Sequence, residues 1–172
     1  MVAVGALATV ATVTDSASEA TVRVVRVFTR DGGGGNLLGI HDGLLGDPVM
    51  QSIAADLGYS ETIFIDVTGD DGIAAVRIFT PVAELPFAGH PLVGATWHVA
   101  APQATVALRC GIGAVAGHRP TVESASIEVA YLPMVERTTA PGATAAWVAR
   151  MPLPYEVHQL ANPQDVASYR LE

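Results

Sequence analysis

The stretch from Glu84 to Gly94 (Glu-Leu-Pro-Phe-Ala-Gly-His-Pro-Leu-Val-Gly) constrains the fold most, because it places a histidine at the predicted start of a helix. Pro91 has a fixed φ and no N–H group, so it suits the first helical position. The segment that follows has residues at helical spacing that can be buried together: Leu92, Ala95, Thr96 and Val99. We therefore predict a helix from Pro91 to Ala100 with one buried face.

His90 is then expected at or next to the cap of this helix. The free backbone N–H groups at a helix start favour anions and disfavour an imidazolium, so we predict a neutral ring with one donor and one acceptor nitrogen. Gly89, just before it, permits a close backbone approach. A cap residue that happens to be histidine would give the same local pattern, and the two interpretations stay open at this level.

The composition fits one ordinary domain or two small ones and excludes several classes of partner. Of the 172 residues 50% are hydrophobic but only 6% are aromatic, so the core must consist mostly of Val, Ala, Leu and Ile. The net charge is −8, and no basic cluster is interleaved with aromatic residues, which argues against a nucleic-acid partner. Cys110 is the only cysteine, which excludes an intrachain disulfide and a cysteine-rich zinc site and fits a reducing cytosol.

The N-terminal residues 1–20 are interpreted as a weakly ordered extension or as a strand that needs a partner. The apolar run from Val2 to Val13 is too short to span a bilayer and lacks the preceding positive charge of a signal peptide. We therefore expect a cytoplasmic protein without a membrane partner.

The next elements carry local signals. Thr21–Thr29 is rich in β-branched residues and predicts a strand. The glycine run 32–35 lacks the Gly-Lys-Ser/Thr of a phosphate loop, so a flexible loop that leads into a short strand, Leu37–His41, is favoured. Asp47–Gly58 predicts a helix with Asp47 as its cap. Its apolar stripe is assigned to the core: Met50, Ile53, Ala54 and Leu57.

Glu61–Val67 and Ile73–Thr80 predict an antiparallel hairpin, because a short Gly/Asp turn separates them. Strand alternation places Glu61 on one face with Ile63 and Ile65. A carboxylate at the mouth of an apolar face is a candidate for partial burial and for general acid/base work. An exposed glutamate at the rim of the sheet is the alternative.

Beyond the central helix, short strands are expected at Ala104–Cys110, at 114–116 and at Ser126–Tyr131. Residues 136–172 form a proline-rich C-terminal segment in which long regular elements are not expected. We interpret this segment as an arm that could reach a partner chain. The main domain is accordingly assigned to residues 21–135.

Six stretches in this order together resemble the PhzF-like phenazine biosynthesis family, over about residues 22–100 and more loosely to about 135. They are Val27–Thr29, Gly35–Asn36, Met50–Ala54, Ser60–Phe64, Arg77–Pro81 and Glu84–Pro91. The resemblance implies an α+β, diaminopimelate-epimerase-like fold, in which a mixed, largely antiparallel β-sheet curls around a central helix.

The resemblance also implies an activity, namely isomerisation of a small acidic metabolite without cofactor or metal. In this family the glutamate of the Ser-Glu-Thr stretch shuttles the proton, a role that maps onto Glu61. The histidine of Gly-His-Pro, here His90, helps to bind or polarise the substrate, and Gly89 would present backbone N–H groups to it. A carboxylate that faces a helix N-terminus suits proton abstraction next to a carbonyl or along an unsaturated acid.

Family members are built from two similar lobes with the site in the cleft between them, and the resemblance here accounts for one lobe. A single-lobe sheet would expose an apolar face and strand edges, which favours self-association. We therefore expect a homodimer in which a second copy completes the site. Two alternatives stay open: a non-catalytic single-lobe protein that binds a small acid, and one half of a hetero-complex.

Overall fold

The computed structural model describes residues 2–15, 18–30, 33–67, 69, 72–129, 134–150, 155–162 and 164–165. The chain divides into two compact units, Met1–Val129 and Ala130–Glu172, and each is considered by itself. The elements of the first unit are β1 (Val2–Asp15), β2 (Ser18–Arg30), β3 (Gly33–Asp42), α1 (Asp47–Leu57), β4 (Glu61–Asp66), β5 (Ile73–Phe79), β6 (Glu84–Leu85), α2 (Gly89–Val99), β7 (Ala104–Cys110), β8 (Gly113–Arg119) and β9 (Ser124–Glu128).

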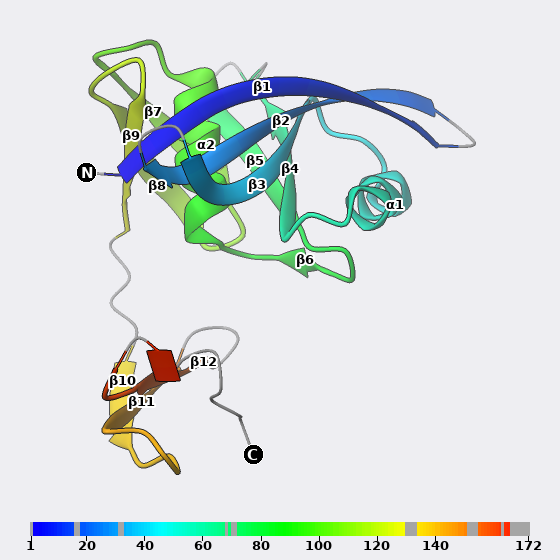
Figure 1. Cartoon of the computed structure of the whole chain (residues 1–172). Helices are drawn as coiled ribbons and strands as arrows, with labels where there is room; N and C mark the ends of the chain where they lie inside the picture. Colours follow the sequence, from blue (N-terminus) through cyan, green and yellow to red (C-terminus); the bar gives the residue numbers. More distant parts are fainter. Residues whose placement is uncertain are drawn as a thin grey trace. The chain divides into compact units, whose positions relative to one another are not determined.

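The described strands of the first unit form one mixed sheet that closes on itself (Figure 1). Its order is β4-β3-β2-β1-β9-β8-β7-β5-β6. An additional antiparallel pairing of β4 with β5 closes the eight strands from β4 to β5 into a ring, and the short strand β6 pairs with β5 beside it. The β3–β4 and β5–β7 pairs are parallel, whereas the other pairs are antiparallel. The predicted α+β class and curled sheet are therefore confirmed. The ring is narrowly joined between β1 and β9, which pair only at Val2↔Ala125 and Ala3↔Ser124.

Helix α2 lies inside this ring and is buried on all sides over most of its length (Figure 1). The core around it is aliphatic, as the low aromatic content predicted. The sequence pattern indicated one buried face, but the ring also encloses the opposite side, including Val93 and Gly94. Close approach is required at two glycines: a Cβ on Gly94 would lie 2.3 Å from Leu38 Cδ2, and one on Gly117 would lie 2.3 Å from Thr96 Oγ1. The strands of the ring therefore pack directly against α2, and neither glycine position has space for a methyl group.

Helix α1 packs on the outer face of the sheet, as Figure 1 shows. Its predicted stripe is confirmed, since Met50, Ile53 and Ala54 are buried and Leu57 packs against the same cluster. The predicted cap is wrong: Gly46 is the N-cap, and the Asp47 carboxylate accepts a hydrogen bond from Arg77 instead. Glu84 binds the same guanidinium, so Arg77 ties α1 to β5 and β6.

Two segments differ from the sequence expectation. Residues 2–15 form strand β1, which pairs with β2, as in the strand alternative left open for residues 1–20. Gly33–Asn36 was expected as a loop, but it is the first part of β3, and Asn36 pairs with Val27 and Gly34 with Thr29. In both segments the pairing with the neighbouring strand β2 overrides a weak local signal.

The C-terminal end of α2 is held by side chains from the surrounding strands. The Arg119 guanidinium donates to the carbonyls of Trp97 and Ala100, and it stacks on the Trp97 ring at 4.9 Å from the centroid. His98 lies 2.6 Å from Asp42 through Nε2 and 3.2 Å from Arg23 through Nδ1. The Arg119 cation at this end complements the helix dipole.

The second unit, Ala130–Glu172, contains a three-stranded antiparallel sheet in its described residues. Its strands are β10 (Met134–Thr138), β11 (Ala145–Arg150) and β12 (Tyr155–Gln159), with β11 in the middle. The described strands of this segment are five or six residues long. Its interpretation as an arm that could reach a partner chain stays a prediction.

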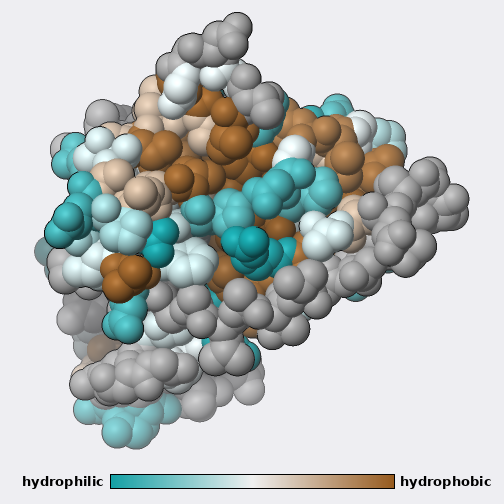
Figure 2. Space-filling model, turned by 90° about the horizontal axis from the view of Figure 1, so that it is seen from above, coloured by the Kyte–Doolittle hydropathy of each residue, from teal (hydrophilic) through white to brown (hydrophobic). Residues whose placement is uncertain are grey.

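Apolar residues also reach the surface, and on the face drawn in Figure 2 they gather in patches beside hydrophilic ones. The large apolar side chains that are exposed among the described residues are Phe28, Leu44, Val67, Val82, Ile112 and Val122. Single exposed apolar residues are ordinary, so a particular one gains meaning only from its neighbours. No helix in the described part of the chain is long and apolar enough to cross a bilayer.

Candidate active site

Glu61 is the first residue of β4 and lies beside Leu38 of the parallel strand β3. Ile63 and Ile65 belong to the core around α2, whereas Phe64 belongs to the cluster under α1. Side chains alternate along a strand, so Glu61 is on the inner face of the ring. Its side chain is 17% exposed. The predicted partial burial is confirmed, and the exposed-rim alternative is excluded.

His90 is the second residue of α2, and its side chain is 9% exposed. The helix begins at Gly89, with Ala88 as an extended N-cap, so Pro91 is the third helical residue and not the first. Proline is tolerated there because the first helical N–H groups have no intrahelical acceptor in any case. This early start turns the His90 ring towards the interior.

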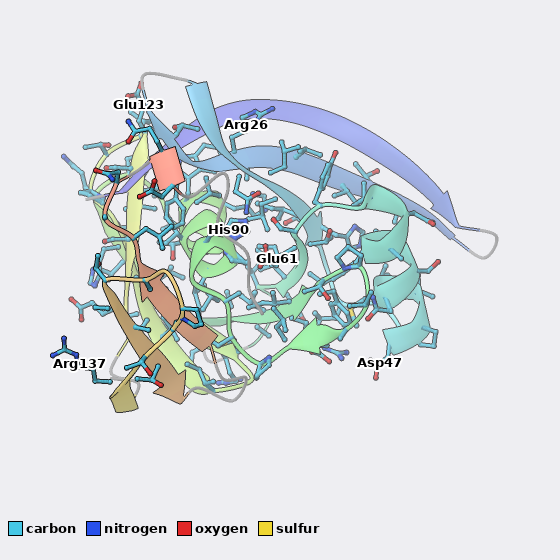
Figure 3. All side chains as sticks on the ribbon, turned by 60° about the horizontal axis from the view of Figure 1, so that its bottom comes forward. Arg26, Asp47, Glu61, His90, Glu123 and Arg137 are labelled. Carbon is cyan, nitrogen blue, oxygen red and sulfur yellow. The ribbon has the colours of Figure 1, made fainter. Side chains whose placement is uncertain are left out.

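The structure brings the two predicted residues together, as Figure 3 shows. His90 Nδ1 lies 3.2 Å from Glu61 Oε2, yet the contact lacks hydrogen-bond geometry. Glu61 Oε2 and His90 Nε2 are buried and have no hydrogen-bond partner. Buried polar atoms are nearly always paired, so two unpaired ones in adjacent side chains indicate a position for a bound polar group.

Burial lowers the pKa of His90 from its ordinary value of 6.5. The Glu61 carboxylate and a hydrogen bond to the Leu37 backbone raise it, but burial outweighs both. The direction agrees with the neutral histidine that the sequence indicated, although burial is the leading cause and not the helix terminus. At neutral pH the ring therefore has one donor and one acceptor nitrogen.

We expect an NMR titration of the His90 ring to give a midpoint below 6.5. In Glu61→Gln the midpoint falls further, because the carboxylate that raises the pKa is gone. The unfolded chain then binds more protons than the folded chain just below pH 6.5, so stability decreases as the pH falls through this window. A midpoint above 6.5, or a rise in Glu61→Gln, would contradict this account.

The start of α2 adds donors and open space to the pair. The N–H groups of Gly89 and His90 precede the first backbone bond of the helix, from Leu92 N to Ala88 O. No atom lies within 4 Å of a Cβ built on Gly89. A small anion can therefore approach the helix start from the side of Gly89.

Phe28 of β2 is a site residue that sequence reasoning did not single out. Its ring is 6.2 Å from the His90 ring between centroids, at an interplanar angle of 56°. The residue is 47% exposed and has a φ of 66°, in the left-handed region. No local sequence signal reveals such a conformation in a phenylalanine.

The described residues include no group of three or more His, Cys, Asp or Glu side chains placed to hold a metal ion. Cys110 lies in another part of the ring, in β7, where its thiol contacts the Gly113 carbonyl at 3.7 Å.

Solved structures share this ring and central helix. The structure of a phenazine biosynthesis PhzC/PhzF protein from Clostridium difficile matches with a TM-score of 0.58 over 80% of this chain and 56% of that one, at 20% identity. A PhzF-family structure from Enterococcus faecalis matches with a TM-score of 0.58 over 84% of this chain and 58% of that one, at 21% identity. At these identities the likeness establishes the fold.

The sequence comparisons establish the family. The PhzC-PhzF model, described as phenazine biosynthesis-like protein, matches residues 25–157, so the chain belongs to this family. An isomerase of Pasteurella multocida is 45% identical over 78 residues, 43% of this chain and 27% of the relative. Trans-2,3-dihydro-3-hydroxyanthranilate isomerase of Pseudomonas aeruginosa is 56% identical over 45 residues, 26% of this chain and 16% of the relative. The matches thus cover a minor part of these relatives, which are named as isomerases.

Proposed function

We propose that this chain is a cofactor-independent isomerase that moves a proton on a small acidic metabolite, with Glu61 as the acid/base. The observation that carries the proposal is the pair of unpartnered, buried polar atoms, Glu61 Oε2 and His90 Nε2, next to the open start of α2. The relatives named as isomerases support the same reaction class.

In the proposed reaction, one Glu61 oxygen removes a proton from a substrate carbon. The C–H electron pair moves into the adjacent unsaturated system, and the double bond shifts. The acidic proton of protonated Glu61 exchanges with solvent, and Glu61 then delivers a proton to a second carbon, so the formula of the substrate is unchanged in water. Neutral His90 and the N–H groups at Gly89 hold the acidic group and stabilise the charge that develops on it.

The test is hydrogen exchange in D₂O with trans-2,3-dihydro-3-hydroxyanthranilate, the compound in the name of the Pseudomonas relatives. The expected result is an isomerised product with deuterium at the new C–H position. The product is detected by ¹H NMR. Binding without exchange would favour a non-catalytic small-acid protein. Activity that appears only with a second, co-purifying polypeptide would favour half of a hetero-complex.

We also propose a homodimer in which a second copy covers the site. Two observations support this: the Phe28 ring beside His90 is exposed, and the space beside Gly89 is open, so a second copy can cover this surface. Light scattering over a concentration series should give twice the 17.8 kDa chain mass. A monomer at every concentration would exclude this arrangement and would place the reaction in an open half-site.

A further inference from the structure

Phe28 breaks the alternation of its strand. Val25 and Val27 face α2 and are fully buried, whereas Arg26 between them belongs to the other face of β2. Regular alternation would place Phe28 on the face of Arg26. Its left-handed φ of 66° turns the side chain, and the ring lies beside His90. The backbone conformation therefore determines which face this ring occupies.

The strand opposite is shaped to accept this conformation. Gly35 of β3 lies across from Phe28, between the register pairs Val27↔Asn36 and Thr29↔Gly34, and has a φ of 75°. A Cβ on Gly35 would lie 2.7 Å from the Val27 carbonyl oxygen and 2.9 Å from Thr29 Cγ2. A left-handed conformation costs free energy in a bulky residue and almost none in glycine. Glycine would therefore be the unstrained choice at position 28.

The strained backbone of Phe28 places an exposed aromatic ring at the site of Glu61 and His90. Phe28 is 47% exposed, although apolar neighbours could cover it if it faced the core. It borders a histidine that is itself buried and has an unpartnered Nε2. Strained conformations persist where the surrounding structure enforces them, and they concentrate at ligand sites.

We propose that Phe28 is a specificity residue whose ring forms a wall of the site and contacts the planar, unsaturated part of the substrate. This inference rests on the proposed function, since the acidic group would lie at the start of α2. An aromatic face packs more closely on a planar skeleton than on a puckered saturated ring. The substrate class narrows accordingly to carboxylic acids that have a planar unsaturated part next to the carbon from which Glu61 takes the proton.

The experiment compares benzoate with cyclohexanecarboxylate, which have the same number of non-hydrogen atoms and differ in planarity. Binding is followed by the NMR shift of the His90 ring in wild type, Phe28→Ala and Phe28→Gly. Wild type should bind benzoate more tightly than cyclohexanecarboxylate. In both variants the ratio of the two affinities should fall about fivefold. An unchanged preference would overturn the role of Phe28 and leave the proposed function intact. If neither acid changes the NMR shift of the His90 ring in wild type, both the role of Phe28 and the proposed function are overturned.

The variants Gln103→Ala and Gln103→Gly are the controls for Phe28→Ala and Phe28→Gly. They separate the release of backbone strain from the loss of the Phe28 ring. Gln103, in the turn after α2, is the other described non-glycine residue with a left-handed φ, at 68°. At both positions the glycine variant should melt about 3 °C above the alanine variant, because glycine releases the strain. Only the Phe28 variants should change the preference between the acids. If the Gln103 variants also lose the preference for benzoate, that loss follows from lower stability of the whole fold and not from the Phe28 ring. This result would refute the proposal.

Discussion

Replacing Glu61 by glutamine is expected to lower the rate of proton exchange into a bound substrate by a factor of about 10² to 10⁴, the usual contribution of a general acid/base. Glutamine has nearly the same shape and occupies the same place beside His90, so the ring of strands should be unaffected. It cannot accept and return a proton, and the reaction needs both steps. The measurement is deuterium incorporation from D₂O by NMR, with circular dichroism as a check on folding.

Glu123→Gln is the matched control for this experiment. Glu123 is exposed in the turn between β8 and β9, away from the pair in Figure 3. Its variant should exchange at the wild-type rate. Equal exchange in Glu61→Gln and wild type would assign the proton transfer to another group and end the proposed mechanism.

The parts of the site that the sequence predicted depend on local periodicity. Ile63 and Ile65 identify the inner face of β4, so the position of Glu61 follows from alternation. The Gly-His-Pro sequence identifies a helix start because proline restricts the backbone there. These two signals are independent, and only the family resemblance indicated that the two residues meet across the ring.

The parts that the sequence did not predict depend on contacts between different elements of the fold. Asp47 has the side chain of a helix cap, but Arg77 is 30 residues away in sequence and binds its carboxylate instead. Gly33–Asn36 has the composition of a loop and becomes a strand because β2 pairs with it. Phe28 has ordinary strand propensity, and its left-handed backbone is enforced only in the folded sheet. Such features require the tertiary structure.

Gly117→Ala should destabilise the first unit by about 3 kcal/mol, at the upper end of the cost of overpacking. The new methyl carbon would lie 2.3 Å from Thr96 Oγ1, 2.8 Å from Thr96 Cγ2 and 3.0 Å from Thr96 Cβ. Thr96 cannot turn away easily, because it is β-branched, fully buried and hydrogen-bonded to the Leu92 carbonyl. Either α2 or β8 must move, and His90 and its pairing with Glu61 depend on the position of α2. Urea denaturation measures the loss.

Two further variants make this prediction specific. Gly89→Ala adds the same methyl group to a helical position with no atom within 4 Å, so its stability should change by less than about 0.5 kcal/mol. Thr96→Ala removes the two atoms nearest to the new methyl group of Gly117→Ala. The double variant should therefore be more stable than the sum of the single effects, with a coupling of about 1 to 2 kcal/mol. Additive effects would mean that α2 and β8 do not meet at this contact, and that the ring encloses its helix more loosely than the distances indicate.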